Sequence, residues 1–179
     1  MLLANMGVPM VCVTIPTMLI ALFPIAWIES LVYRSRLELP RKEAFWGTFS
    51  ANLCSTLVGV PIVWLPLVIA QISIGGSRAW GIETSRQKLE AVTLQAAWLI
   101  PYRDHTGWMI PAAALVLLLP FYLGSVFVEH WILAKRWRSE GQQPSLAIVA
   151  LANALSYFGL ALYYGAQLWW QADSIVVSE

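Results

Sequence analysis

Two short stretches of the chain carry the same polar pattern within otherwise apolar sequence. Residues 51–59 and 152–159 both read Ala-Asn-x-x-Ser followed shortly by Gly, and a Glu lies 23 or 24 residues before each Asn. Asn and Ser three residues apart share one face of a helix. A carboxyl group can accept hydrogen bonds from both side chains, and within a membrane it can also exchange a proton or bind a cation. The candidate polar cluster comprises Glu29, Asn52, Ser55, Glu129, His130, Asn153 and Ser156.

This cluster has two interpretations. In the structural one, Glu29–Asn52 and Glu129–Asn153 are interhelical ties, which is the usual role of small and polar residues on helices in lipid. In the functional one, the two carboxyls form a proton or cation site that faces a shared interior. The tie is favoured, because each Glu lies near a basic helix end, where its side chain can reach water at little cost.

Other residues with chemical potential lack the partners that chemistry requires. His130 directly follows Glu129, so on a helix the two side chains point about 100° apart and cannot share a ligand face. Asp104 and His105 have no third residue at metal-ligand spacing. The sequence contains no phosphate-binding glycine loop and no hydrolase motif. We therefore expect no enzyme, no cofactor and no metal site; Cys12 and Cys54 are expected to be small buried apolar residues.

Composition indicates that the solvent of this chain is lipid. Hydrophobic residues make up 59% of the 179 residues, charged residues 12%, and the mean hydropathy is +0.66. Soluble domains have about 25% charged residues and about 45–50% apolar ones. The net charge of +1 argues against nucleic acid as a partner, because phosphate binding needs a strong basic excess. Two cysteines exclude a disulfide-framed secreted domain.

Charged residues fall in clusters, and the uncharged stretches between them predict the elements that position the polar cluster. Each stretch is longer than the about 20 residues that cross a bilayer core as a helix. We expect four helices, near residues 8–34, 45–74, 107–135 and 145–170. The predicted fold class is all-α: a polytopic membrane protein whose four transmembrane helices form two pseudo-repeated helical hairpins.

The expected organisation follows from the repeat. Residues 1–75 form a first transmembrane hairpin, residues 76–106 an outer loop, and residues 107–179 a second hairpin. In the loop, Thr84-x-x-Gln87 has the form of a capping box, which predicts a short amphipathic helix. Its apolar positions at helical spacing are Leu89, Val92, Ala96 and Leu99.

The distribution of Lys and Arg predicts the orientation. Seven of the eleven basic residues lie in two short loops: Arg34, Arg36, Arg41, Lys42, Lys135, Arg136 and Arg138. Basic residues concentrate in cytoplasmic loops, so we expect these loops in the cytoplasm and both termini outside, in the cell membrane. Trp46 and Trp137 beside them are expected in an aromatic belt at headgroup depth.

Three classes of function are compatible with this pattern. The favoured class is a non-catalytic integral membrane protein that acts as a subunit, scaffold or assembly factor of a membrane complex. The alternative is a small proton- or cation-coupled transporter or channel that uses the paired intramembrane Glu residues. A membrane enzyme acting on a lipid is the third, and the sequence offers no catalytic set for it. The expected partners are the lipid bilayer and either another membrane protein or a second copy of the chain.

Overall fold

The computed structural model describes residues 7–75, 81–100, 105–138 and 141–176, with side chains to residue 171. About 85% of these described residues are helical. Among the described residues, four helices are long and apolar enough to cross a membrane. The predicted number of helices long and apolar enough to span a membrane is therefore confirmed.

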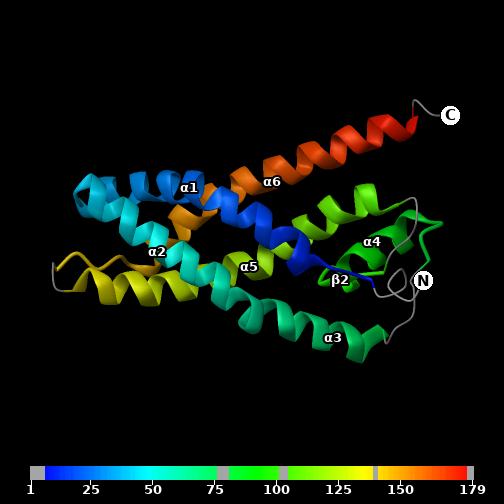
Figure 1. Ribbon diagram of the computed structural model, residues 1–179, viewed down its shortest axis with the longest axis horizontal. Coiled ribbons are helices and arrows are strands. Elements are labelled where there is room, and N and C mark those ends of the chain that lie inside the picture. Colours follow the sequence, from blue (N-terminus) through cyan, green and yellow to red (C-terminus); the bar gives the residue numbers. More distant parts are fainter. Residues whose placement is uncertain (1–6, 76–80, 101–104, 139–140, 177–179) are drawn as a thin grey trace. The chain divides into compact units, whose positions relative to one another are not determined.

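The four spans follow one another along the chain (Figure 1). The first is α1 (Met10–Leu37), and the second joins α2 (Arg41–Gly59) to α3 (Leu65–Gly75) through a π-helical turn, Val60–Trp64. The third is α5 (Thr106–Arg136), and the fourth is α6 (Leu146–Val176). The expected helix ranges lie within a few residues of these bounds at most ends.

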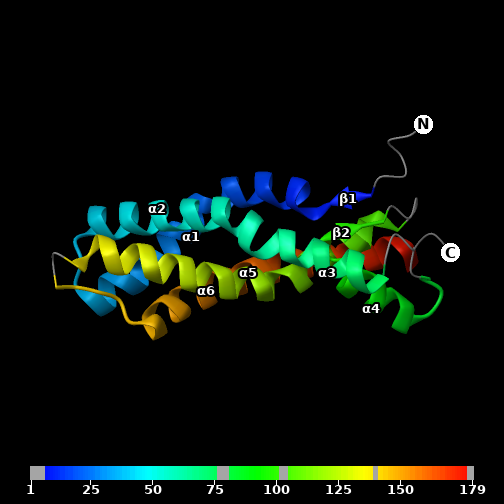
Figure 2. The same cartoon turned by 90° about the horizontal axis from the view of Figure 1, so that it is seen from below.

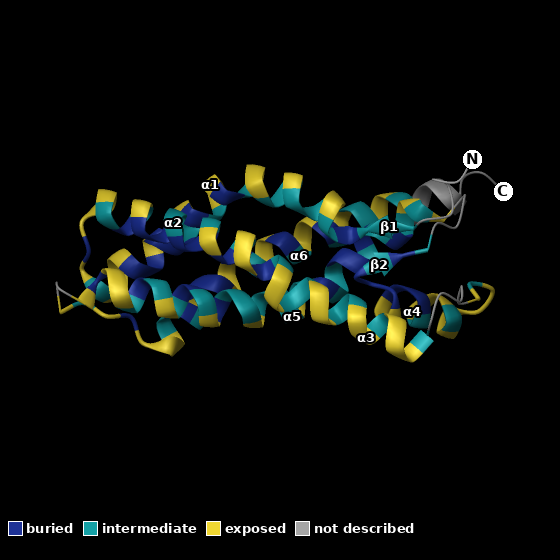
Figure 3. Cartoon of the chain, turned by 60° about the horizontal axis from the view of Figure 1, so that its bottom comes forward, coloured by how far each residue is buried: buried dark blue, intermediate teal, exposed yellow. Residues whose placement is uncertain are grey.

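Most of the apolar side chains on these spans are not buried by the protein itself. In the most apolar 18-residue stretch of each span, only 11–28% of the residues are buried. Exposed residues recur along the sides of the helices (Figure 3). Side chains such as Ile20, Leu119 and Phe158 have more than half of their surface exposed. An apolar surface of this extent is stable against lipid or against another apolar helix, and not against water.

Pro61 explains the irregular turn within the second span. It lies second in the π-helical segment Val60–Trp64, and a proline has no backbone N–H to donate to the preceding turn. Widening the helix by one residue lets the chain continue into α3 without a break. The span as a whole runs from Arg41 to Gly75, which is 35 residues.

The contacts divide the chain into two compact units. The first unit contains Met1–Thr14, Trp64–Leu119 and Leu160–Glu179; the second contains Ile15–Val63 and Pro120–Gly159. The second unit holds part of each span and every member of the predicted polar cluster. The division predicted from the sequence, into two hairpins and an outer loop at residues 1–75, 76–106 and 107–179, was based on the repeat and not on these contacts. It stays a prediction.

The core of the second unit is built from alanine, valine and leucine side chains around two large aromatic side chains. Tyr33 and Trp137 are fully buried and meet edge to face, with ring centroids 5.3 Å apart. The Trp137 indole donates to Glu43 Oε1 at 3.1 Å, and Arg136 donates to the same oxygen at 3.0 Å. These bonds join the end of α5 to the start of α2, so the two basic loops meet at one end of this unit (Figure 2).

The first unit contains a small cap made of two-residue strands and a side chain. β1 (Val8–Pro9) pairs antiparallel with β2 (Trp98–Leu99). The Gln71 amide completes the cap, because its Nε2 donates to the Trp98 carbonyl at 2.8 Å and its Oε1 accepts from the Trp98 amide at 3.2 Å. The sequence analysis did not predict these strands.

The capping box predicted at Thr84 is present at the start of α4 (Ser85–Leu94). The Thr84 amide donates to Gln87 Oε1 at 2.9 Å, and the Gln87 amide donates to Thr84 Oγ1 at 3.3 Å. The helix is shorter than the apolar spacing predicted, because Ala96 and Leu99 lie beyond its end and are buried in the following turn and strand. Of the apolar positions within the helix, Val92 is buried and Leu89 is 61% exposed.

Two expectations about packing were wrong. Cys12 and Cys54 are exposed rather than buried, since both lie on helix faces turned away from the protein. Trp137 is fully buried rather than in an aromatic belt, because its indole packs against α2 and binds Glu43. Gly159, the glycine of the second repeated motif, does not bring another helix close, because a Cβ placed there would meet nothing within 4 Å.

Candidate functional site

Two carboxyl groups lie at the centre of the second unit. Glu29 is on α1 and Glu129 is on α5, and both side chains are 0% exposed. The residues around them on α2 and α6 are small or polar. A carboxyl group can be buried in this way only where its oxygens find hydrogen-bond donors.

The Glu29 carboxyl accepts one hydrogen bond from each of two helices. Asn52 Nδ2 on α2 donates to Oε2 at 2.7 Å, and the Ser156 hydroxyl on α6 donates to Oε1 at 2.6 Å. Asn52 and Ser156 are themselves buried. Glu29 therefore links α1 to both α2 and α6.

The Glu129 carboxyl has the equivalent pair of donors with the helices exchanged. Asn153 Nδ2 on α6 donates to Oε2 at 2.9 Å, and the Ser55 hydroxyl on α2 donates to Oε1 at 2.9 Å. Glu129 therefore links α5 to both α6 and α2. Together the four bonds join all four helices of this unit.

The donors are held in place by their own helices. Asn52 also donates to the Thr48 carbonyl, and Asn153 to the Val149 carbonyl, each four residues back at 3.2 Å. Each Ser hydroxyl lies 3.0 Å from the carbonyl of the Asn three residues before it. These local bonds restrict the rotamers of the donors and aim them at the carboxyls.

The cluster contains no cation in the part of the chain that the structure describes. Neither Glu29 nor Glu129 forms a salt bridge there, and the four donors to their carboxyl oxygens are all neutral side chains. A buried charge without a counter-charge is costly in lipid. The site is therefore one of hydrogen bonding rather than of ion pairing.

Comparisons with protein-family models, with curated proteins and with solved structures gave no match.

The structure brings together six of the seven residues of the predicted cluster. The exception is His130, whose Nδ1 is buried and has no hydrogen-bond partner among the described residues. Of the loop pair, Asp104 lies outside the described residues. No group of three or more His, Cys, Asp or Glu side chains suited to a metal ion occurs within residues 7–75, 81–100, 105–138 and 141–171.

Sequence reasoning placed each Glu opposite the Asn of its own half, and it did not predict the exchanged serine bonds. Ser55 and Glu129 are 74 residues apart, and Glu29 and Ser156 are 127 apart. The available signal was the position of each Ser on the same helix face as its Asn. Spacing alone does not tell which carboxyl that face meets.

Proposed function

We propose that this chain is a non-catalytic integral membrane protein that serves as a subunit, scaffold or assembly factor of a membrane complex. The observation that carries this proposal is the bonding of the two carboxyls. All four carboxyl oxygens are taken by donors from neighbouring helices. A site built for substrate or catalysis would keep such a group free to act on a ligand, whereas a fully bonded cluster fixes the arrangement of helices.

The apolar exterior supports the same proposal. Few residues of each span are buried within the chain, and the second span is the least buried, at 11% of its apolar stretch. A scaffold or subunit needs such faces, because helix association in lipid depends on packing between them. The partner is another membrane protein or a second copy of this chain, and the remaining faces meet lipid.

The proposed architecture is two pseudo-repeated hairpins, residues 1–75 and 107–179, joined by the outer loop at 76–106. The matching bonds support it: each half contributes a Glu, an Asn and a Ser in the same order, and the four types of local and interhelical bond are the same in both. Two parallel halves would be related by a pseudo-two-fold axis along the membrane normal. The basic loops would face the cytoplasm, and both termini the outside of the cell membrane.

The proposal is tested by isolating the protein from its native membrane in a mild detergent and recording its native mass. A stoichiometric complex with another membrane protein, or a homodimer, is the expected result. Its dissociation by leucine-to-asparagine changes on one exposed helix face would locate the interface. A chain that is monomeric in native membranes and in every detergent would contradict the proposal.

A second candidate function is proton- or cation-coupled transport, and one observation favours it. Ser55 and Ser156 each lie within hydrogen-bond reach of both a carboxyl and a backbone carbonyl. A hydroxyl so placed can donate to a carboxylate, or accept from a carboxylic acid while it donates to the carbonyl. The cluster can therefore hold the carboxyl with or without its proton. Under this candidate, replacing both Glu by Gln would abolish flux.

A further inference from the structure

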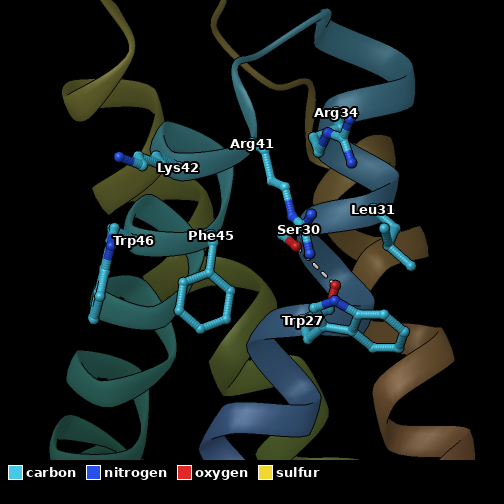
Figure 4. A pocket seen from close by; sticks show the side chains of 8 residues that line it. All are labelled: Trp27, Ser30, Leu31, Arg34, Arg41, Lys42, Phe45 and Trp46. Carbon is cyan, nitrogen blue, oxygen red and sulfur yellow. Dashed lines mark hydrogen bonds between the residues drawn. The ribbon is translucent and has the colours of Figure 1, made fainter.

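A pocket of about 660 Å³ lies between α1 and α2 near their basic ends, wholly within the second unit (Figure 4). Three of its lining residues are cations, Arg34, Arg41 and Lys42. The Arg41 side chain extends between the two helices toward Ser30, and Arg34 lies on the α1 side (Figure 4). The polar cluster does not use this pocket, because Glu29 faces the core and is fully buried.

The pocket cations are available to an anion. Among the described residues, none of Arg34, Arg41 and Lys42 forms a salt bridge. The nearby Glu43 does not neutralise them, since it accepts hydrogen bonds from Arg136 and Trp137. All three cations are exposed.

The start of α2 adds to this positive potential. Pro40 occupies the N-cap position and forms no side-chain capping bond, so the first backbone amides of α2 have no side-chain acceptor from this residue. Free amides at a helix N-terminus favour an anion. Arg41 and Lys42 are the first two residues of this helix.

The rest of the pocket is apolar and belongs to the membrane-spanning helices. Trp27 and Leu31 lie one turn apart on α1, and Phe45 and Trp46 lie on α2. Trp27 is 53% exposed although it lies seven residues inside Arg34, about 10 Å along the helix. The cations therefore stand at one end of a wall that suits a hydrocarbon chain.

We propose that this pocket binds an anionic phospholipid, with the phosphate headgroup at Arg34, Arg41 and Lys42 and one acyl chain along Trp27 and Phe45. Basic pockets between helices at the membrane surface recognise such headgroups. The apolar wall favours a lipid over free phosphate, because a phosphate ion has no apolar part that could pack against it. The ligand class is thus an amphiphile with a phosphate group and not a soluble anion.

The proposal is tested with the full chain purified in detergent and titrated with phosphatidylglycerol or phosphatidylcholine, with bound lipid counted by native mass spectrometry. The test variant is Arg34→Gln/Arg41→Gln/Lys42→Gln. The matched control is Arg36→Gln/Lys135→Gln/Arg138→Gln, which removes the same charge from exposed residues of the same basic loops that do not line the pocket.

We expect wild type and control to bind the first phosphatidylglycerol equally and in preference to phosphatidylcholine, and the pocket variant to bind it at least about tenfold more weakly. An equal loss of phosphatidylglycerol affinity in both triple variants would overturn the proposal. It would show that the lipid is attracted by the basic surface in general and not by the pocket. Displacement of the lipid by millimolar inorganic phosphate would also overturn it in favour of a free-anion site. If the triple variant does not fold, Arg41→Gln alone is expected to weaken binding, and no change would count against the pocket.

Discussion

The Ser156 hydroxyl lies 2.6 Å from Glu29 Oε1, although 127 residues separate the two in the sequence. The bond joins the last span to the first. Its counterpart, between Ser55 and Glu129, joins the second span to the third. Each carboxyl thus bridges two helices, so the arrangement of the second unit depends on four side-chain bonds in addition to packing.

Replacing Glu29 by Gln should change stability little, whereas replacing it by Leu should be costly. A Gln side chain can accept from Asn52 and donate to the Ser156 hydroxyl, so both partners remain bonded. Leu removes both interhelical bonds and leaves one N–H of the buried Asn52 amide without an acceptor, at about 1–3 kcal/mol, while the Ser156 hydroxyl keeps its bond to the Asn153 carbonyl. Unfolding in mixed detergent micelles measures the difference. The control is Glu38→Gln, at an exposed residue. An equal loss of stability in the Gln and Leu variants of Glu29 would contradict the hydrogen bonds described.

The two serine bonds should contribute equally to stability. Ser55→Ala and Ser156→Ala each remove one interhelical bond and leave the Asn bond in place. We expect each loss to be near the average of about 0.6 kcal/mol found for side-chain hydrogen bonds in membranes, and at most about 2 kcal/mol. Double-mutant cycles with Glu129→Leu and Glu29→Leu, which remove the hydrogen-bond acceptor, should show coupling within the bonded pairs and none across them. Coupling of Ser55 to Glu29 rather than to Glu129 would refute the exchanged pattern.

Two glycine-to-alanine changes should have opposite effects. A Cβ at Gly47 would lie 2.6 Å from Cζ2 of Trp137, and that indole is fully buried and cannot move aside. Overpacking of this kind costs about 1–3 kcal/mol, which exceeds the up to about 1 kcal/mol that alanine gains as a helix former. At Gly159 a Cβ meets nothing within 4 Å, so alanine there should be neutral or stabilising. Thermal unfolding in one detergent compares the two, and a stabilised Gly47→Ala would show that the Trp137 packing is wrong.

The proposed orientation predicts which sites a membrane-impermeant thiol reagent can reach in intact cells. Cys12 and Cys54 are both exposed on helices, so they are first replaced by Ala. Arg36→Cys should then be protected until the membrane is permeabilised, and Ser178→Cys, which lies outside the described residues, should be labelled at once. The reverse labelling pattern would invert the topology, because the basic loops would then face outward.

Sequence reasoning predicted the spans well because lipid imposes a simple requirement on them. About 20 apolar residues must run without charge, and charges must mark the ends. The same reasoning placed Glu29 near Asn52, since the two are joined by a short loop and their depths follow from helical rise. It predicted the start of α4 for a similar reason, because the bonds between Thr84 and Gln87 are local.

The features that sequence reasoning did not predict depend on which helix face meets which neighbour. Ser156 shares a face with Asn153, and yet the two residues bind different carboxyls on different helices. Trp137 lies beside a basic loop, where tryptophan is typical of a membrane interface, but its contact with Tyr33 buries it. Gly159 has the motif of a packing residue, but it lies on an open face of its helix. From the sequence, Arg34, Arg41 and Lys42 served only to predict the orientation of the loops. That they line one pocket with Trp27 and Phe45 depends on how α1 lies against α2.

Proton flux in reconstituted vesicles tests the central claim most directly, which is that the paired carboxyls hold helices together and do not carry ions. Vesicles with a trapped pH-sensitive dye and an imposed pH gradient would contain wild type or Glu29→Gln/Glu129→Gln, and charge compensation would be supplied by a potassium ionophore. The account predicts that both proteins leave the gradient to decay at the rate of protein-free vesicles. Faster decay with wild type that the double variant abolishes would contradict it and assign the cluster to proton transport.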